Sequence, residues 1–227
     1  MKNIGSRLEA ALGILKNESP KKLFADIGSD HAFLAIEAKK RGYAEKVIAS
    51  DINPLPLEKG RINASLQNIE SDFILSDGFD SIDEFGIDAA AVCGMGGELI
   101  ADIIARSKTA KECLLILQPM SAQEILRAYL WENGFDITKE VFVCENKKPY
   151  TVMSVKYTGV NTEFSYSDTY LGKERPRTEE FSRYAEKVML RASKRRKGEL
   201  ATDKDTSDSD LLISECQTHL TSFSAGQ

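Results

Sequence analysis

The segment Lys22–Ala32 constrains the fold more than any other part of this chain. A short apolar run leads into Asp26 and Gly28, and a helix-like pattern follows at once. In parallel α/β sheets, such a strand-to-helix turn meets a nucleotide-type ligand at the carboxyl end of the first strand. Glycine lets the backbone approach the ligand closely, and the next helix offers its N-terminus. We therefore expect a parallel α/β fold with a ligand site at this turn.

The spacing of glycine and carboxylates in this turn separates two classes of cofactor. A dinucleotide site requires G-x-G-x-x-G, so that a pyrophosphate can lie on backbone amides. Here a single glycine lies between Asp26 and Asp30. Two carboxylates would repel a pyrophosphate, which disfavours an NAD-dependent oxidoreductase, but they suit the ammonium and sulfonium charges of S-adenosylmethionine. The alternative is a tight turn in which Asp30 caps the helix.

Further apolar runs predict the rest of a sheet. Strands at residues 47–51, 73–78, 87–93 and 113–117 alternate with helices at 32–41, 53–68, 98–106 and 121–132, the last capped by Ser121. Another helix, capped by Ser6, precedes the first strand. Residues 135–144 and 150–157 alternate across the short loop Asn146–Pro149, which is typical of an antiparallel hairpin. The pattern predicts an α/β fold with the Rossmann-like class I methyltransferase sheet, parallel with an antiparallel edge hairpin.

Two of these strands end in carboxylates that suit a nucleoside. Asp51 ends the second strand, 23 residues after Gly28, where an acidic residue takes the ribose hydroxyls in both NAD-binding and S-adenosylmethionine-binding folds. Asp77 precedes Gly78 at the end of the third strand and could accept a hydrogen bond from an adenine amino group. An ordinary Asp-Gly turn is the alternative for Asp77.

Three glycines in four residues follow the fourth strand, in the segment Gly94–Gly97. Glycines at a strand end are unfavourable unless backbone must come close to another group. Because this segment lies between a strand and a helix, we predict part of the functional site there, with a flexible loop as the alternative.

Charge and hydropathy change after about residue 160. Thr178 is expected to cap an amphipathic helix, and a second helix follows an acidic loop at residues 201–210. Residues 173–197 carry ten basic and four acidic side chains, a net charge of +6, although the whole chain carries −5. A basic arm on an acidic body indicates a polyanionic partner; a solvated helix face is the alternative. We predict two domains, residues 1–160 and residues 161–227, the second a small helical hairpin.

Membrane, secreted and metal-dependent classes are disfavoured. No apolar stretch approaches the roughly 18–20 residues of a membrane span, and the first residues lack a signal-peptide core. Four cysteines lie far apart, which favours buried thiols in a reducing cytoplasm. His31 and His219 are distant in sequence and no cysteine cluster accompanies them, so we expect no metal site.

Four motifs together form a recognisable set: Asp26-Ile27-Gly28-Ser29-Asp30-His31-Ala32, Cys93-Gly94-Met95-Gly96-Gly97, Leu117-Gln118-Pro119 and Asn146-Lys147-Lys148-Pro149-Tyr150. Over residues 1 to about 157 the chain resembles the bacterial tRNA (adenine-22-N1)-methyltransferase family, TrmK. The resemblance implies a Rossmann-like catalytic domain with a small helical, coiled-coil-like C-terminal domain. It also implies methyl transfer from S-adenosylmethionine to N1 of an adenosine in tRNA.

The resemblance also implies roles for residues of the cofactor site. Asp26, Gly28 and Ser29 would hold the methionine end of the cofactor. Asp51 would bind the ribose with Ile52 and Asn53 beside it, and Asp77 with Gly78 would bind the adenine. The remaining expected cofactor contacts are Asp30, His31 and Cys93.

The resemblance likewise implies how the target base is held. Gly94, Met95, Gly96 and Gly97 take the place of the Asn/Asp-Pro-Pro-aromatic motif of many amine methyltransferases, and they would position the base. No general base is expected, because N1 of adenine has a lone pair and no proton to lose. Met120 follows Leu117-Gln118-Pro119 where the family often has Asn, so no polar role is expected at that position. The expected tRNA contacts lie in the basic helix: Arg183, Lys187, Arg191, Lys194, Arg195, Arg196 and Lys197.

Two other functions remain open from the sequence. One is an S-adenosylmethionine-dependent methyltransferase that acts on a small molecule or a protein. The other is a non-catalytic RNA-binding protein with a cofactor fold, against which the retention of Asp26, Gly28 and Asp51 argues. We expect the protein to be a cytoplasmic monomer.

Overall fold

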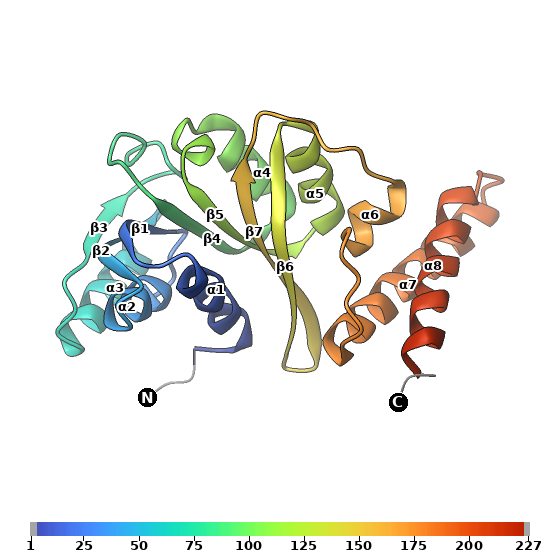
Figure 1. Ribbon diagram of the computed structural model, residues 1–227, viewed down its shortest axis with the longest axis horizontal. Coiled ribbons are helices and arrows are strands. Elements are labelled where there is room, and N and C mark those ends of the chain that lie inside the picture. Colours follow the sequence, from blue (N-terminus) through green and yellow to red (C-terminus); the bar gives the residue numbers. More distant parts are fainter. Residues whose placement is uncertain (1–3, 225–227) are drawn as a thin grey trace.

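The computed structural model describes residues 4–224 and contains a seven-stranded sheet with helices on both faces (Figure 1). The strand order is β3-β2-β1-β4-β5-β7-β6. Strands β1 to β5 pair in parallel, and β7 runs antiparallel to both β5 and β6. The predicted parallel sheet with an antiparallel edge hairpin is therefore confirmed. The strand bounds are β1 Lys21–Ile27, β2 Ala44–Asp51, β3 Asp72–Leu75, β4 Ala89–Gly96, β5 Leu114–Ser121, β6 Phe135–Glu145 and β7 Lys148–Tyr157.

Two apolar layers cover the sheet because the central strands are apolar at almost every position and send alternate side chains to opposite faces. Phe24 of β1 belongs to one layer and its neighbour Ala25 to the other. The Phe24 layer packs on α1 (Ser6–Asn17), α2 (Phe33–Lys40) and α3 (Pro54–Leu66). The Ala25 layer packs on α4 (Gly97–Arg106) and α5 (Gln123–Glu132). A short 3₁₀ turn, η1 (Thr109–Lys111), leads into β5.

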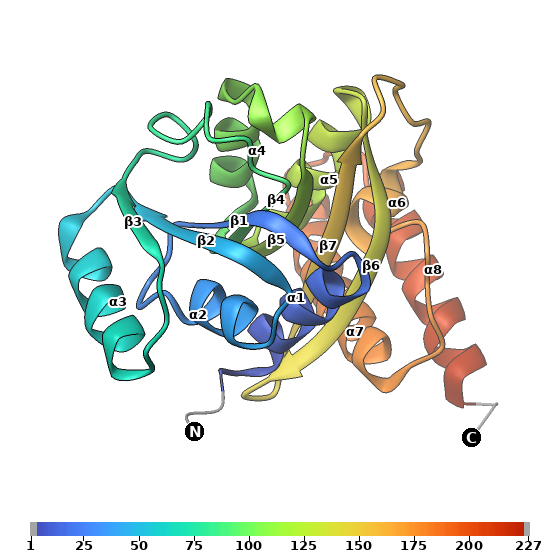
Figure 2. The ribbon, with the colours of Figure 1, turned by 60° about the vertical axis from the view of Figure 1, so that its left-hand side comes forward.

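The C-terminal helices lie beside the hairpin edge of the sheet (Figures 1 and 2). Helices α7 (Glu179–Leu200) and α8 (Ser207–Ser224) pack on each other and on α6 (Tyr166–Leu171). Their apolar cluster includes Phe142 of β6, whose ring lies 4.7 Å from that of Phe181. The predicted helical pair is present, while a domain boundary at residue 160 stays a prediction.

Several predicted element ends are wrong, each for a local reason. Ser6 does not cap α1, because Gly5 occupies the N-cap and Ser6 is already helical. Ser121 does not cap α5, because β5 continues through Ser121, which pairs with Gly96 of β4. Thr178 does cap α7, since its side chain accepts from the N–H of Phe181.

Two C-terminal segments are more helical than their polar composition indicated. Residues 166–171, for which no helix was predicted, form α6, which begins with a reciprocal capping box between Ser165 and Asp168. Helix α8 begins at Ser207, so the predicted acidic loop at residues 201–210 is too long. Asp208 and Asp210 lie in the first turn of α8, where the helix dipole favours negative charge.

Candidate active site

A cavity of about 440 Å³ opens at the carboxyl ends of β1 and β4. It is bounded by the β1–α2 turn, the end of β4, the end of β5 and the first turn of α1. Of the predicted site residues, it brings together Asp26, Gly28, Ser29, Asp30, His31, Cys93, Gly94 and Met95. Sequence reasoning missed Arg7, Leu8, Phe33 and Leu34, and assigned no role to Gln118 or Met120, which also line the cavity.

Asp26 is the most unusual group in this cavity. Its carboxylate is buried and accepts a hydrogen bond from Ser29 Oγ at 2.6 Å. Burial raises the pKa of Asp26 to about 6; the bonds from Ser29 and from the Ala35 backbone oppose the rise, and repulsion from Asp51 adds to it. Among residues 4–224, no Lys or Arg pairs with Asp26. A buried carboxylate with an open cavity beside it and no cation suits a positively charged ligand.

The turn after Asp26 holds three residues in the left-handed region of backbone space. Gly28 has a φ of 69°, His31 of 69° and Ala32 of 56°. Ala32 occupies the N-cap of α2 without a side-chain cap, so Asp30 does not cap this helix. The Asp30 carboxylate instead faces His31 at 3.4 Å and is mostly exposed. A non-glycine residue in the left-handed region is strained and persists only where the surrounding structure fixes its backbone. Such residues cluster at ligand sites.

The glycine segment is not the flexible loop that was the alternative prediction, because β4 runs through Gly96. Its pairing with β5 shifts twice: Cys93 pairs with Gln118, Met95 with Pro119 and Gly96 with Ser121. The shifts leave Gly94 and Met120 without partners in the register, and both line the cavity. Such bulges re-aim backbone and side chains next to functional sites.

The glycines of this segment serve different purposes. Gly94 has a φ of 84° and open space where a Cβ would lie, so its backbone is free to approach a ligand. Gly97 begins α4, where a Cβ would overlap the carbonyl oxygen of Ala122. Gly96 and Gly97 do not line the cavity. In the first turn, a Cβ on Gly28 would overlap the methyl group of Met95, so Met95 packs directly over that glycine.

Arg7 connects α1 to the other rim of the cavity. It donates to Glu145 Oε1 at 2.9 Å and to Gln118 Oε1 at 3.1 Å, and its guanidinium lies 4.9 Å from the Tyr150 ring centroid. Gln118 is fully buried and also donates to the Pro119 carbonyl. The partners of Arg7 lie far from it in the sequence, so no local pattern reveals these contacts. The position of Gln118 in an apolar strand, directly before Pro119, is itself an indication of a buried polar contact.

The predicted nucleoside-binding residues lie outside the cavity lining. Asp51 sits beside the first turn, since Ser29 N–H donates to the adjoining Ser50 carbonyl at 2.9 Å. One Asp51 oxygen accepts from the Asn53 N–H at 2.7 Å. Asp77 pairs with Arg106 at 3.1 Å. Ile52 is 60% exposed, Asn53 is the N-cap of α3, and Gly78 packs against α4.

Cys93 lies beside Asp26 in the cavity wall. Burial raises the pKa of the Cys93 thiol, and repulsion from Asp26 adds to the rise. The thiol is therefore protonated at neutral pH and acts as a small apolar wall.

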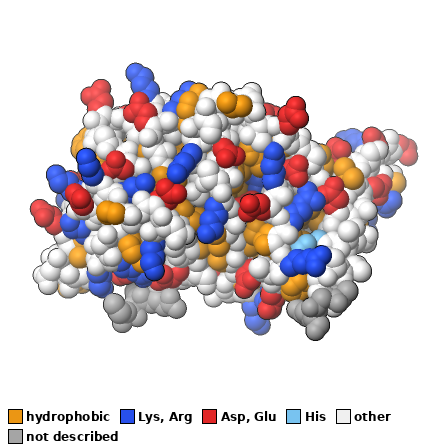
Figure 3. All heavy atoms as spheres, in the orientation of Figure 1, with side chains coloured by type: hydrophobic (Ala, Val, Ile, Leu, Met, Phe, Trp, Pro, Cys, Tyr) orange, Lys and Arg blue, Asp and Glu red, His pale blue; other side chains and the backbone are white. Residues whose placement is uncertain are grey.

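The basic residues of α7 have three kinds of surroundings. Arg183 is exposed and Arg196 partly exposed, and they pair with Glu179 and Asp210, respectively. Lys187, Arg191 and Arg195 instead line a second cavity that faces α5. Acidic and basic side chains are interspersed over the face seen in Figure 3, without one broad basic field on that face. Lys194 and Lys197 are exposed.

Residues 4–224 contain no group of three or more His, Cys, Asp or Glu side chains arranged to hold a metal ion. Within the same residues, all four cysteines are free thiols. No described helix combines the length and apolar character needed to span a membrane.

Comparison with known proteins agrees with this geometry. Residues 4–153 match a family described as "Methyltransferase domain". The strand order, the cavity at the strand ends and this match define the class of the protein, a methyltransferase-domain protein.

Individual relatives narrow the class. A Bacillus subtilis tRNA (adenine(22)-N(1))-methyltransferase is 33% identical over 155 residues, which are 66% of this chain and 63% of the relative. A Streptococcus agalactiae protein of the NADB-Rossmann superfamily is 25% identical, with a TM-score of 0.82 over 96% of this chain and 97% of that one. M. capricolum TrmK in complex with S-adenosyl-homocysteine has a TM-score of 0.74 at 19% identity, over 98% of this chain and 96% of that one. This chain belongs to the tRNA (adenine-22-N1)-methyltransferase family, TrmK.

Proposed function

We propose that this chain transfers a methyl group from S-adenosylmethionine to N1 of adenine 22 in tRNA, in the cytoplasm. The observation that carries the proposal is the buried Asp26 carboxylate, which lacks a cationic partner among the described residues and faces a cavity between two strand bulges. The B. subtilis relative is named for this reaction, and the M. capricolum relative binds the cofactor product.

The donor groups of the first turn fit this cofactor. Asp26 would hold its ammonium group, Ser29 keeps the Asp26 carboxylate oriented, and the left-handed Gly28 lets the backbone come close. Asp51 retains an oxygen for the ribose while the other accepts from Asn53. Asp77 with Gly78 would reach the adenine, with Arg106 fixing the Asp77 carboxylate. When bound, S-adenosylmethionine supplies an electrophilic methyl group on a sulfonium.

The residues around the target base need only orient it, because N1 of adenine attacks with a lone pair and releases no proton. The unpaired Gly94 backbone is available to accept from the adenine N6 group and so to fix the ring. Leu8, Phe33 and Leu34 exclude water from one side of the cavity. Because positive charge moves from the sulfonium to the base during transfer, the carboxylates around the site, Asp26, Asp30 and Asp77, are the candidates to stabilise it.

The basic helix α7 is proposed to bind the tRNA body. An adenine in a folded tRNA must leave its stack to reach the cavity, at a cost of a few kcal/mol. Contacts between α7 cations and phosphates would offset that cost. We expect a monomer to suffice.

The deciding experiment is methyl transfer from labelled S-adenosylmethionine to unmodified tRNA, followed by nucleoside analysis. We expect 1-methyladenosine from the wild type and none from Asp26→Ala. A tRNA transcript with guanine at position 22 is the matched substrate control, and it should accept no label. Cofactor binding without label in tRNA would favour a small-molecule or protein substrate. Absence of both binding and label would favour a non-catalytic protein.

A further inference from the structure

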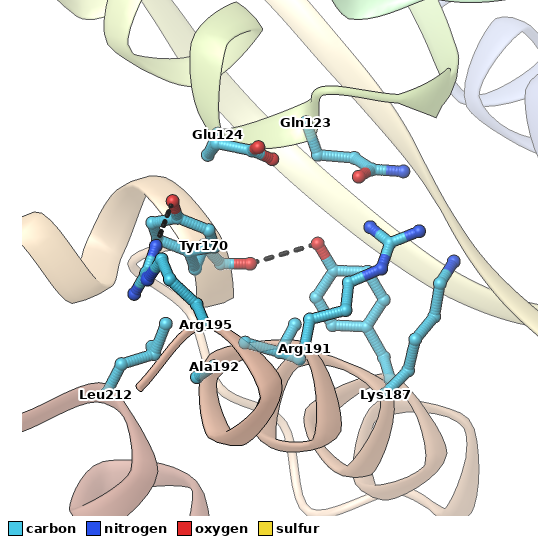
Figure 4. A pocket seen from close by; sticks show the side chains of 10 residues that line it. Gln123, Glu124, Tyr170, Lys187, Arg191, Ala192, Arg195 and Leu212 are labelled. Atoms are coloured by element: carbon cyan, nitrogen blue, oxygen red, sulfur yellow. Dashed lines mark hydrogen bonds between the residues drawn. The ribbon is translucent and has the colours of Figure 1, made fainter. Parts of the chain in front are cut away.

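A second cavity, of about 180 Å³, lies between α5 and the C-terminal helices. Its walls come from the first turn of α5, the end of α6 and one face of α7 (Figure 4). This α5–α7 pocket is about as large as six water molecules, which is room for a phosphate group.

Three cations one turn apart on α7, namely Lys187, Arg191 and Arg195, line this pocket. Figure 4 shows Lys187 and Arg191 rising from α7 with both charged ends toward Gln123. Like charges four residues apart on a helix repel each other. Burial lowers the pKa of Lys187, and repulsion from Arg191 and Lys148 lowers it further.

Two of these three cations, Lys187 and Arg191, have no carboxylate partner within residues 4–224, and the third, Arg195, has one N–H group without a partner. Within residues 4–224, Arg191 has neither a carboxylate partner nor a hydrogen-bond acceptor, and Lys187 donates only to the Pro149 carbonyl at 3.2 Å. Arg195 bonds to Tyr170 and Ser209 and lies 3.4 Å from Glu199, yet its Nη2 is buried without a partner. Glu124 is the one acidic residue of the lining, and Figure 4 shows it on the α5 wall, across from α7.

The pocket adjoins the catalytic cavity through two shared contacts. The Tyr150 ring has Lys187 Nζ 5.6 Å from its centroid and the Arg7 guanidinium 4.9 Å from it, and Arg7 lines the catalytic cavity. The Pro119 carbonyl accepts from Gln118 of the catalytic cavity and from Gln123 of the pocket. A chain of nucleotides with one base in the catalytic cavity would therefore pass the pocket within a short distance.

We infer that the α5–α7 pocket binds a backbone phosphate of the tRNA close to the nucleotide whose base enters the catalytic cavity. This inference rests on the proposed function and adds a defined site to it. Lys187 and Arg191 supply the charge, Arg195 supplies a fixed N–H donor, and Tyr150 keeps the phosphate site in register with the catalytic cavity.

The test compares Arg191→Ala with Arg177→Ala in the full-length protein loaded with S-adenosylhomocysteine. Arg177 is also an exposed arginine of the C-terminal part, but it lies outside the pocket and outside the basic set of α7. We expect Arg191→Ala to weaken tRNA binding about tenfold at 0.1 M salt and to reduce the slope of log affinity against log salt by about 0.7–0.9. Arg177→Ala should change affinity less than about twofold. Cofactor affinity should be unchanged in both, and Tm should not fall in either, because Arg191 has no partner to lose within the described residues and its removal relieves repulsion on Lys187.

Phosphate-ethylation interference then locates the contact. Ethylation of a phosphate within a few nucleotides of position 22 should weaken binding to the wild type but not to Arg191→Ala. Equal effects of the two variants, or interference that Arg191→Ala leaves unchanged, would overturn the inference. The inference would also be overturned if inorganic phosphate bound at a site that depends on Arg191 while Arg191→Ala left tRNA affinity unchanged, since the pocket would then serve a free anion. In each case, methylation of tRNA by the wild type would leave the proposed function intact.

Discussion

At the scale of single residues, the raised pKa of Asp26 should make the stability of the unliganded protein depend on pH. The carboxyl titrates at about 6 in the folded chain and near 3.8 when solvated, so the folded state holds the extra proton between these values. The contribution of Asp26 to the free energy of unfolding of the unliganded protein should therefore fall by about 3 kcal/mol as pH rises from about 4 to about 6. Urea denaturation of the wild type and Asp26→Asn at each pH should show this fall in the difference between the two proteins, in which the contributions of the other carboxylates cancel.

Cofactor affinity should have the opposite pH dependence, because only the ionised Asp26 attracts an ammonium group. Below pH 6, the Kd of the wild type should rise about tenfold per pH unit. For Asp26→Asn, the Kd should stay flat and lie about 30-fold higher at pH 7.5, which corresponds to roughly 2 kcal/mol. Calorimetric titration with S-adenosylhomocysteine measures both quantities. A pH-independent Kd in the wild type would contradict the role given to Asp26.

Alanine substitutions at two glycines should have opposite effects on the free energy of unfolding. A Cβ at Gly97 would overlap the Ala122 carbonyl, whereas Gly13 in α1 is exposed with open space around it. Gly97→Ala should lower the free energy of unfolding by about 1–3 kcal/mol. Gly13→Ala should raise it by about 0.5–1 kcal/mol. Thermal and urea unfolding of the two variants measure these opposite effects. A Gly97→Ala protein as stable as the wild type would mean that the β5–α5 junction shifts to accommodate the added methyl group at little cost.

At the scale of elements, the sequence predicted the sheet well because buried parallel strands are continuous apolar runs bounded by polar turns. It failed where one element's length depends on its neighbour. Strand β4 extends through Gly96 only because β5 continues to Ser121, and neither end carries a local signal. The first strand-to-helix turn lies where it was predicted, between β1 and α2, and Asp26 and Gly28 line the cavity there, while their contacts with the cofactor stay predictions. The roles assigned to Asp51 and Asp77 stay predictions, as both lie outside that lining.

The α5–α7 pocket could not be foreseen from the sequence, although its cations were expected to bind RNA. Its walls are separated by about sixty residues of chain, and periodicity within α7 alone does not reveal which face meets α5. One available signal was overlooked. Arg127 interrupts the apolar stripe of α5 between Leu126 and Leu130, and a charged residue in such a stripe indicates a buried partner.

At the scale of the whole molecule, Arg127 ties the catalytic sheet to the C-terminal helices. It is fully buried, pairs with Glu140 of β6 at 2.5 Å, and donates to the Thr169 and Tyr170 carbonyls of α6 and to the Tyr184 hydroxyl of α7. Arg127→Met should lower the free energy of unfolding by about 3–5 kcal/mol, because Glu140 is left as a buried unpaired charge.

A double variant separates the ion pair from the rest of this network. Arg127→Met/Glu140→Leu should regain part of the lost stability, since no unpaired charge remains. The KM for tRNA should be higher than that of the wild type in both the single and the double variant, because in both the carbonyls of α6 lose their donor and α7 loses its contact with Arg127. Cofactor affinity should be unchanged in both. Recovery of the wild-type KM in the double variant would show that the carbonyl contacts do not matter for tRNA binding.

The contact between Arg7 and Glu145 also has a consequence for biosynthesis. These two residues are 138 positions apart in the chain, and their contact holds Arg7, which lines the catalytic cavity. While the chain emerges from a ribosome, α1 must wait for the β6–β7 hairpin before it can dock in its final place. A nascent chain that ends before the hairpin therefore carries Asp26 and Gly28 but no completed pocket, and the enzyme becomes competent to bind its cofactor only late in its own synthesis.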